Sequence, residues 1–158
     1  VNGEAMGGGF EIALACDLII ASDTARLALQ EPKVGLAALA GGLHRLPRQI
    51  GLKRAMGMML TGRHVMAEEG EALGFVNEVV PQTELMDSAM RWAGMITECS
   101  PASVRTTKEV AMKGLDTANF QEAFSQKYDA VGRLFKGPDF IEGPRAFAEK
   151  RKPNWSGE

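Results

Sequence analysis

The spacing of apolar positions along the chain changes near residue 81. Before this point, short apolar runs alternate with glycine-rich loops, a pattern typical of strands and short helices that follow one another. After Pro81, apolar residues recur every three or four positions, which is the period of amphipathic helices. The pattern therefore predicts a mixed α/β segment over residues 1–81 and a helical segment over residues 82–158.

The same pattern places individual elements. In the first segment we expect the end of a strand at 1–3, a buried helix at 7–16, strands at 18–21, 26–29 and 75–80, and helices at 43–50, 52–60 and 67–73. In the second segment we expect helices at about 83–98, 102–115, 118–135 and 143–151. Gly51 and Gly74 directly follow two of these helices, as glycines at helix C-termini commonly do.

Composition narrows the class of protein. The 158 residues carry a formal net charge of −2, so no strong attraction to nucleic acid or to an anionic membrane is expected. No apolar run approaches the length of a membrane span. Cys16 and Cys99 form no CxxC pair, and we expect both to be reduced and at least half-buried, as in a cytoplasmic protein. Because the chain opens with Val1 in the middle of a pattern, we expect the sequence to lack its N-terminal part.

Gly7, Gly8 and Gly9 end the first predicted strand and begin the first predicted helix. Glycines let the backbone approach a ligand closely, and a helix N-terminus presents unpaired N–H groups that suit a developing oxyanion. The plain alternative is a tight turn, because neither a P-loop lysine nor the later glycine of a dinucleotide-binding fingerprint follows. Glu11 favours a functional site, since a carboxylate in an apolar helix is costly to bury without a role.

Glu31 follows the predicted strand at 26–29. It is either a solvated loop acid or a partner of Glu11, and two carboxylates that meet in one site can divide acid and base roles. The loop at 39–42 precedes a helix, where glycine can serve as a weak cap.

Other conspicuous residues have plain explanations. His44 and His64 lack metal-ligand spacing, so no metal site is predicted. Methionines such as Met59 fall at helical spacing, which indicates a packed interior or a subunit interface. The basic cluster at 149–153 is either a solvated end or a contact for phosphate groups.

Several stretches form a set of motifs that covers essentially the whole chain. They are residues 1–3 with 7–17, 31–36, 40–42, 45–51, 60–62, 67–69, 73–81 and 146–153. In these motifs the chain resembles the enoyl-CoA hydratase/isomerase (crotonase) superfamily. The resemblance implies the C-terminal part of a crotonase-like ββα spiral, with residues 1–81 in the spiral core and residues 82–158 as a helical trimerisation region. It also implies an acyl-CoA substrate, coenzyme A only as part of that substrate, no metal, and a homo-oligomer, either trimer or hexamer.

The resemblance also implies roles for individual residues. The Gly8 N–H would bind the thioester carbonyl as one half of an oxyanion hole, whose other N–H would lie upstream of this sequence. Glu11 and Glu31 would form the acid/base pair that adds or removes water across the α,β double bond. The remaining substrate contacts would be made by Met6, Gly7, Leu39, Phe147 and Lys150.

Two points carried over from the family concern the ends of the site. Phe147 and Lys150 would contact the CoA nucleotide, in a neighbouring subunit. Because one oxyanion donor would lie upstream, we expect these 158 residues alone to be inactive.

One loop departs from the family pattern. Ala38-Leu39-Ala40-Gly41-Gly42 stands where the family often has Pro-Gly-Ala-Gly-Gly. Leu39 adds bulk near the expected position of the reacting water, which leaves open a branched, aromatic or carnitine-like acyl group. The resemblance implies that the presence of both glutamates favours a hydratase or dehydratase over those isomerases that keep only the counterpart of Glu31. An isomerase, a racemase-type enzyme or a decarboxylase of the same family is the alternative. A non-catalytic assembly or RNA-binding member of the fold is a further alternative, although the mild negative charge argues against RNA.

Overall fold

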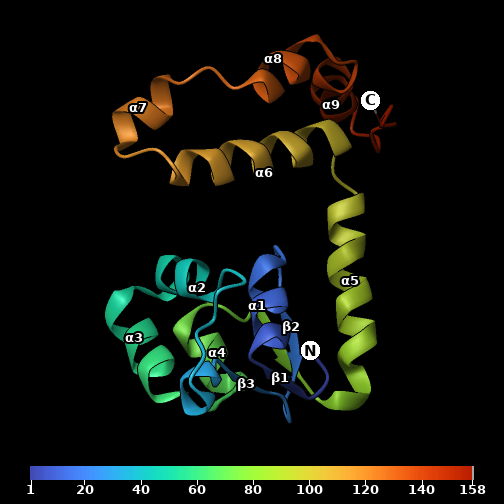
Figure 1. Cartoon of the computed structure of the whole chain (residues 1–158). Coiled ribbons are helices and arrows are strands. Elements are labelled where there is room, and N and C mark those ends of the chain that lie inside the picture. The colour runs from blue at the N-terminus through green and yellow to red at the C-terminus, as the bar shows by residue number, and fades with distance from the viewer. Residues whose placement is uncertain (158) are drawn as a thin grey trace. The chain divides into compact units, whose positions relative to one another are not determined.

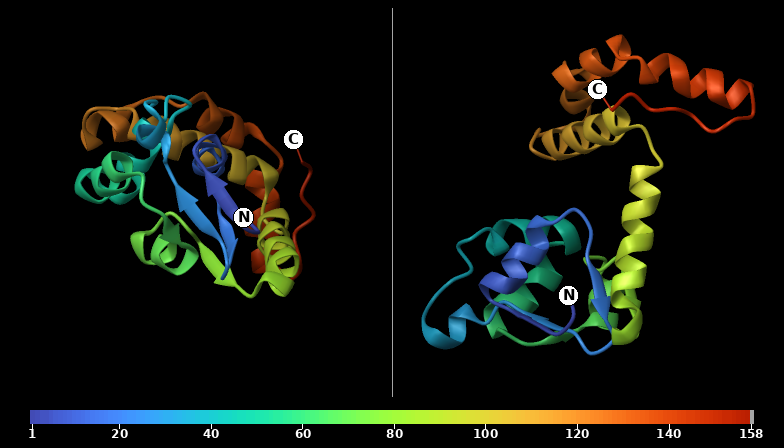
Figure 2. Two further views of the ribbon diagram at one scale, coloured as in Figure 1. Left: turned by 60° about the horizontal axis from the view of Figure 1, so that its bottom comes forward. Right: turned by 90° about the vertical axis from the view of Figure 1, so that its right-hand side faces the viewer.

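The computed structural model describes residues 1–157, which form two compact units (Figures 1 and 2). Unit 1 is Val1–Arg91, and unit 2 begins at Trp92. The boundary lies inside one helix, α5 (Leu85–Thr97), and falls later than the change of sequence pattern at residue 81. It does so because Ser88 and Arg91, in the first part of α5, both donate hydrogen bonds to Glu78 of strand β5 (Glu78–Val80).

Unit 1 is built on two small sheets. In one, β1 (Glu4–Met6) pairs in parallel with β3 (Arg26–Ala28), which pairs antiparallel with β4 (Val65–Met66). In the other, β2 (Ile20–Ser22) pairs in parallel with β5. The prediction missed β4, because two residues are too short to show a strand period. The predicted mixture of strands and helices in this half is confirmed.

The α-helices of unit 1 follow the predicted order, whereas its two 3₁₀ helices were not predicted. In chain order these helices are α1 (Gly8–Ala15), the 3₁₀ helix η1 (Glu31–Val34), α2 (Gly42–Ile50), α3 (Leu52–Thr61), α4 (Ala67–Leu73) and the 3₁₀ helix η2 (Gln82–Glu84). Gly74 ends α4 with a φ of 96°, a left-handed conformation that glycine adopts without a steric penalty. The strand expected at 75–80 is only β5, because the N–H groups of Phe75 and Val76 bond the Gly70 carbonyl in the turn that ends α4.

Helix α1 is held by the core of unit 1. Phe10 is fully buried, and its ring lies 5.2 Å from the ring of Phe75, centroid to centroid. The helix also packs against β1 and α2 (Figure 1). The expectation that α1 is buried on all sides is wrong for Ile12, which is 71% exposed because it faces away from these partners.

The two cysteines correct a second expectation. Cys16 and Cys99 are free thiols, but both are exposed rather than half-buried. Cys16 follows the last turn of α1, and its thiol lies 3.5 Å from the carbonyl oxygen of Ile12, so it shares that residue's exposed face.

Unit 2 is helical, as predicted. Its helices after α5 are α6 (Pro101–Leu115), α7 (Phe120–Ser125), α8 (Asp129–Lys136) and α9 (Asp139–Ala148). Figure 1 shows α7 near the C-terminal end of α6. The single helix predicted at 118–135 is wrong, since α7 and α8 are separate. The Tyr128 hydroxyl donates to the carbonyl oxygen of Ala123, a group that a continuous helix would bond to the N–H of Lys127.

Among residues 1–157, no helix is both long and apolar enough to cross a membrane.

Candidate functional site

The candidate site lies at one edge of the sheet in unit 1. Strands β1 and β3 are parallel, with Met6 opposite Ala28, so their carboxyl ends meet at the same edge. The Gly7 N–H extends the ladder by donating to Ala28 O at 2.8 Å. Gly7 then begins the turn into α1, while Glu31 follows β3 after a short link. The topology therefore brings the glycine triplet and Glu31 to one place.

Gly8 is the first residue of α1 and is exposed. Its N–H belongs to the group that a helix leaves without an intrahelical acceptor. Gly7 precedes it with φ 53° and ψ −123°, a conformation that favours glycine. This turn presents the N-terminus of α1 at the same edge as Glu31.

Glu11 lies one turn further along α1 and is only 5% exposed. Its Oε1 accepts a hydrogen bond from the Gly42 N–H at 2.8 Å, so the start of α2 holds the carboxylate. A Cβ at Gly42 would lie 3.1 Å from both Cγ and Oε1 of Glu11. Glycine at this position therefore lets the backbone come close enough to bond the buried carboxylate.

Glu31 contacts the other end of the glycine turn. A Cβ at Gly7 would lie 3.2 Å from Glu31 Oε1. Glu31 Oε2 is buried and has no hydrogen-bond partner among the described residues. An unpaired buried carboxylate oxygen costs free energy, and in a native protein it calls for an explanation such as a ligand or a water.

The structure separates the sequence-predicted residues into two groups. Met6, Gly7, Gly8, Glu11 and Glu31 all belong to the region around the start of α1 in unit 1. Phe147 and Lys150 lie in unit 2, at and just beyond the end of α9, and Phe147 is 88% exposed.

Leu39 lies in the loop before α2 and is 81% exposed. Its N–H donates to Ala37 O at 2.8 Å, so in this conformation the amide is engaged within its own loop.

Sequence reasoning missed two residues of this site. It treated the glycines before α2 only as a weak cap, whereas Gly42 supplies the N–H that bonds Glu11. It assigned nothing to Arg45, whose guanidinium donates to Ala40 O at 3.1 Å in the same loop. The pair Gly41-Gly42 at a predicted helix start was the available signal for a close backbone approach.

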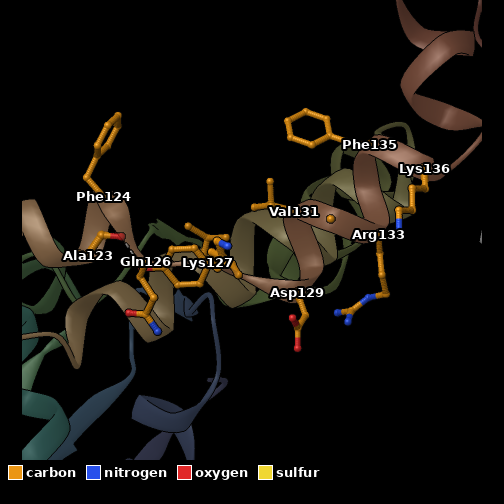
Figure 3. A pocket seen from close by; sticks show the side chains of 12 residues that line it. Ala123, Phe124, Gln126, Lys127, Asp129, Val131, Arg133, Phe135 and Lys136 are labelled. Atoms are coloured by element: carbon orange, nitrogen blue, oxygen red, sulfur yellow. Dashed lines mark hydrogen bonds between the residues drawn. The ribbon is translucent and has the colours of Figure 1, made fainter.

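A separate cavity of about 860 Å³ lies within unit 2 (Figure 3). Its walls come from α6, α7, α8 and the link between α7 and α8, and they include the aromatic residues Phe124, Tyr128 and Phe135. Among residues 1–157, Asp129 is the only carboxylate that lines it, and none of the candidate residues of unit 1 does so. This cavity therefore lacks the paired carboxylates that the acid/base hypothesis requires.

The described residues contain no group of three or more His, Cys, Asp or Glu side chains placed to hold a metal ion. The candidate groups that lie near the start of α1 are carboxylates and backbone N–H groups.

Comparison with known proteins shows that the chain matches a protein family. The family described as enoyl-CoA hydratase/isomerase matches residues 1–158. The mevalonyl-coenzyme A hydratase of Aspergillus fumigatus is 43% identical over 98% of this chain and 58% of its own length. The carnitinyl-CoA dehydratase of Proteus mirabilis is 40% identical over 99% of this chain and 61% of its own length.

A solved structure supports the same relationship. The crystal structure of an enoyl-CoA hydratase from Bacillus anthracis matches with a TM-score of 0.93 and 38% identity, over 99% of this chain and 60% of that one. The predicted crotonase-like fold is confirmed by this match. The chain spans about 60% of the length of the relatives it matches. Since the family match covers every residue and the fold agrees with a solved hydratase, the chain belongs to the enoyl-CoA hydratase/isomerase family.

Proposed function

We propose that the protein is an acyl-CoA hydratase or dehydratase, with Glu11 and Glu31 as its acid/base pair and the Gly8 N–H as an oxyanion donor. The observation that carries the proposal is the pair of carboxylates around the start of α1. Glu11 is buried and held by the Gly42 N–H, and Glu31 has a buried oxygen without a partner among residues 1–157. Glu11 belongs to α1 and Glu31 lies against Gly7, directly before that helix, and the exposed N-terminus of α1 suits a thioester oxyanion.

The reaction needs these three elements together. The oxygen of water bonds to Cβ of the unsaturated acyl group while one carboxylate accepts the proton of the water. The electron pair of the double bond moves towards the thioester oxygen, where backbone N–H groups stabilise the negative charge. The other carboxyl group then gives a proton to Cα as the thioester carbonyl reforms. Removal of one oxyanion donor typically costs about 3–4 kcal/mol of barrier stabilisation.

The names of two relatives support a substrate class. One relative is a hydratase of a mevalonyl thioester and the other a dehydratase of a carnitinyl thioester, so both handle acyl groups with polar substituents. Leu39 replaces a glycine that the family often has near the expected position of the water. We therefore propose a substituted acyl-CoA as substrate, with Met6, Gly7 and Leu39 near its acyl group. Phe147 and Lys150 would contact the nucleotide of a substrate that is bound by a neighbouring subunit.

Replacement of each carboxylate tests the proposal in the intact protein. Glu11→Gln and Glu31→Gln keep the side-chain size and remove the acid/base function, so we expect each to lower kcat by about 10²–10⁴-fold. Steady-state assays with crotonyl-CoA and with substituted enoyl-CoAs measure this. Glu68→Gln, which changes an exposed acid in α4, is the matched control and should leave kcat unchanged. Undiminished turnover in both site variants would reject the assigned roles.

Product analysis separates this function from the alternatives of the same family. A hydratase incorporates one oxygen from ¹⁸O-labelled water at Cβ. A shifted double bond without ¹⁸O indicates an isomerase, and release of CO₂ indicates a decarboxylase. If no substrate turns over and RNA binds instead at sub-micromolar protein in a salt-sensitive manner, the non-catalytic alternative holds.

The finer properties of the intact protein belong to the same proposal. We propose that it works without a cofactor beyond the CoA part of its substrate, in the cytoplasm, as a homotrimer or hexamer. The many exposed apolar side chains of the chain support the assembly.

A further inference from the structure

Arg45 bonds the loop that precedes α2 through both its side chain and its backbone. Its Nη1 donates to Ala40 O at 3.1 Å, and its backbone N–H donates to Gly41 O at 2.8 Å. No ion pair to Arg45 occurs among residues 1–157, so its guanidinium serves the loop rather than a carboxylate.

These two bonds restrain Gly41 from both sides. The carbonyl of Ala40 belongs to the peptide group before the Gly41 Cα, and the carbonyl of Gly41 belongs to the peptide group after it. The two torsions of Gly41 set the relative orientation of these two peptide groups. Arg45 bonds both carbonyls and therefore restrains both torsions of Gly41, together with the His44 N–H, which also donates to Gly41 O at 3.1 Å.

The restraint matters because Gly41 is held in a backbone conformation that few residue types adopt. Its φ is 113° and its ψ is −5°. A Cβ at this position would lie 1.9 Å from Arg45 Nη1, so the guanidinium occupies the volume that a side chain would fill. Glycine alone is compatible with both features, but glycine is also the residue with the most conformational freedom to lose.

The peptide group between Gly41 and Gly42 contacts the candidate site. Its N–H is the N–H of Gly42, which donates to Glu11 Oε1 at 2.8 Å. Rotation about the Gly41 torsions would turn this N–H away from the carboxylate. The orientation of Glu11 thus depends on a loop conformation that Arg45 holds.

We propose that Arg45 is a positioning residue for Glu11, acting through the Ala40–Gly41–Gly42 backbone. This inference rests on the proposed function of Glu11. It does not require that Arg45 touch the substrate. It predicts that loss of the guanidinium bond lowers turnover more than it lowers substrate binding, because the acid/base geometry is disturbed and the substrate contacts are not.

The same helix supplies a matched control. Arg48 is also exposed and lies one turn further along α2, where its Nη1 donates to His44 O at 2.9 Å. Arg48→Met removes a comparable bond from arginine to a backbone carbonyl, but at a distance from Glu11 along the chain. Arg45→Met removes the bond of interest and keeps the aliphatic stem, and Arg45→Lys restores one cationic donor.

The experiment measures kinetics and amide exchange on the intact protein. For Arg45→Met we expect kcat to fall about tenfold with KM changed by less than about twofold, and Arg45→Lys to recover part of the loss. Hydrogen exchange of the Gly42 amide, followed by NMR, should become about tenfold faster in Arg45→Met, while the amide of Gln49 late in α2 is unaffected. Arg48→Met should change neither quantity.

The outcomes keep this inference separate from the proposed function. If Glu11→Gln abolishes turnover while Arg45→Met behaves like Arg48→Met in both kcat and Gly42 exchange, the inference is overturned and the function stands. If exchange accelerates along the whole of α2, Arg45 only stabilises the helix, and the inference is again overturned. If the wild-type protein turns over no acyl-CoA, the proposed function fails, and the Gly42 exchange rate still decides whether Arg45 holds the loop.

Discussion

At the scale of single residues, two glycines make room for the two carboxylates. Gly7 lies against Glu31, and Gly42 lies against Glu11. In each case the space that a side chain would occupy is close to a carboxylate oxygen, at 3.2 Å and 3.1 Å. Because glycine has no side chain, each carboxylate can lie close to the backbone at these positions. An added methyl group should therefore displace the neighbouring carboxylate.

Gly42→Ala tests this in the intact protein. The added methyl group would also lie 3.0 Å from the Ala38 Cβ, so we expect a loss of stability of about 1–3 kcal/mol from overpacking. We further expect kcat to fall about tenfold or more, because Glu11 is displaced. Steady-state kinetics and melting temperatures at equal protein concentration measure both effects.

Gly57→Ala provides the contrast for that variant. Gly57 lies within α3, and a Cβ there would meet no atom within 4 Å. Alanine should therefore stabilise the helix by about 0.5–1 kcal/mol and leave kcat unchanged. Equal kinetics of Gly42→Ala and Gly57→Ala would contradict the argument.

The same residues show how far sequence alone reaches. A carboxylate inside the apolar stretch around Glu11, and a second after a strand at Glu31, could both be selected from the sequence. The Gly42–Glu11 bond joins residues far apart in the chain, and only the packing of α1 against α2 creates it. Arg45 could not be selected from the sequence, because it bonds backbone carbonyl groups, which every residue type has.

At the scale of elements, helices that end at glycine were placed well, and short or broken elements were not. Gly51, Gly62 and Gly74 follow α2, α3 and α4 as expected. At the gap between α7 and α8, the Tyr128 hydroxyl bonds Ala123 O five residues earlier in the chain, and the spacing of apolar residues does not reveal this bond. Predictions from apolar spacing fail where a nearby side chain bonds a backbone carbonyl that a continuous helix would use.

The segment after α9 has no regular secondary structure, and hydrogen bonds to carboxylates hold it in place. Glu142 accepts bonds from the Arg151 guanidinium, at 2.6 Å and 3.0 Å, and from the Asn154 N–H at 2.7 Å. The Trp155 indole donates to Glu98 O at 2.9 Å. The bonds from Arg151 and then from Asn154 lower the pKa of Glu142 from 4.5 to about 2.

Acid should release this segment. A carboxyl group with a lowered pKa in the folded state stabilises that state above its ordinary pKa of 4.5, and the contribution is lost as the pH falls towards 2. Asp139 changes in the same direction, because the Ser100 hydroxyl and then the Ser156 N–H lower its pKa. We expect the emission of Trp155 to shift to longer wavelength between about pH 4.5 and pH 2, as the indole enters water.

The difference in emission between the protein and its Trp155→Phe variant isolates this signal. Glu142→Gln should give the shifted emission already at pH 7, because the amide loses the charge that holds Arg151. Glu122→Gln, an exposed acid of α7 in the same unit, is the control and should keep the native spectrum. An unshifted spectrum for Glu142→Gln at pH 7 would show that Glu142 does not fasten the segment.

At the scale of the whole molecule, many large apolar side chains are exposed, and exposed side chains of this kind mark an interaction site where they form one contiguous patch. Methionines illustrate this, since Met58 and Met59 are buried in the core while Met86, Met90 and Met112 are exposed. The sequence reading allowed either a packed interior or an interface for these residues, and periodicity cannot distinguish the two. Helical spacing marks an apolar face, and only the fold shows whether the chain itself covers that face.

Helix α7 offers the sharpest test of self-association. Phe120 and Phe124 are 79% and 77% exposed, and their rings stack one turn apart at 6.0 Å. A second copy of the chain that covers these two rings would stabilise the assembly, because burial of apolar surface contributes about 25 cal/mol of favourable free energy per Å². We expect the intact protein to sediment as a trimer or hexamer at micromolar concentration, and the double change Phe120→Ser and Phe124→Ser to shift it towards smaller species.

Gln121→Ser, an exposed polar change on the same helix, should leave the sedimentation unchanged. A wild-type monomer, or a double variant that sediments like wild type, would mean that this face is not covered by another copy.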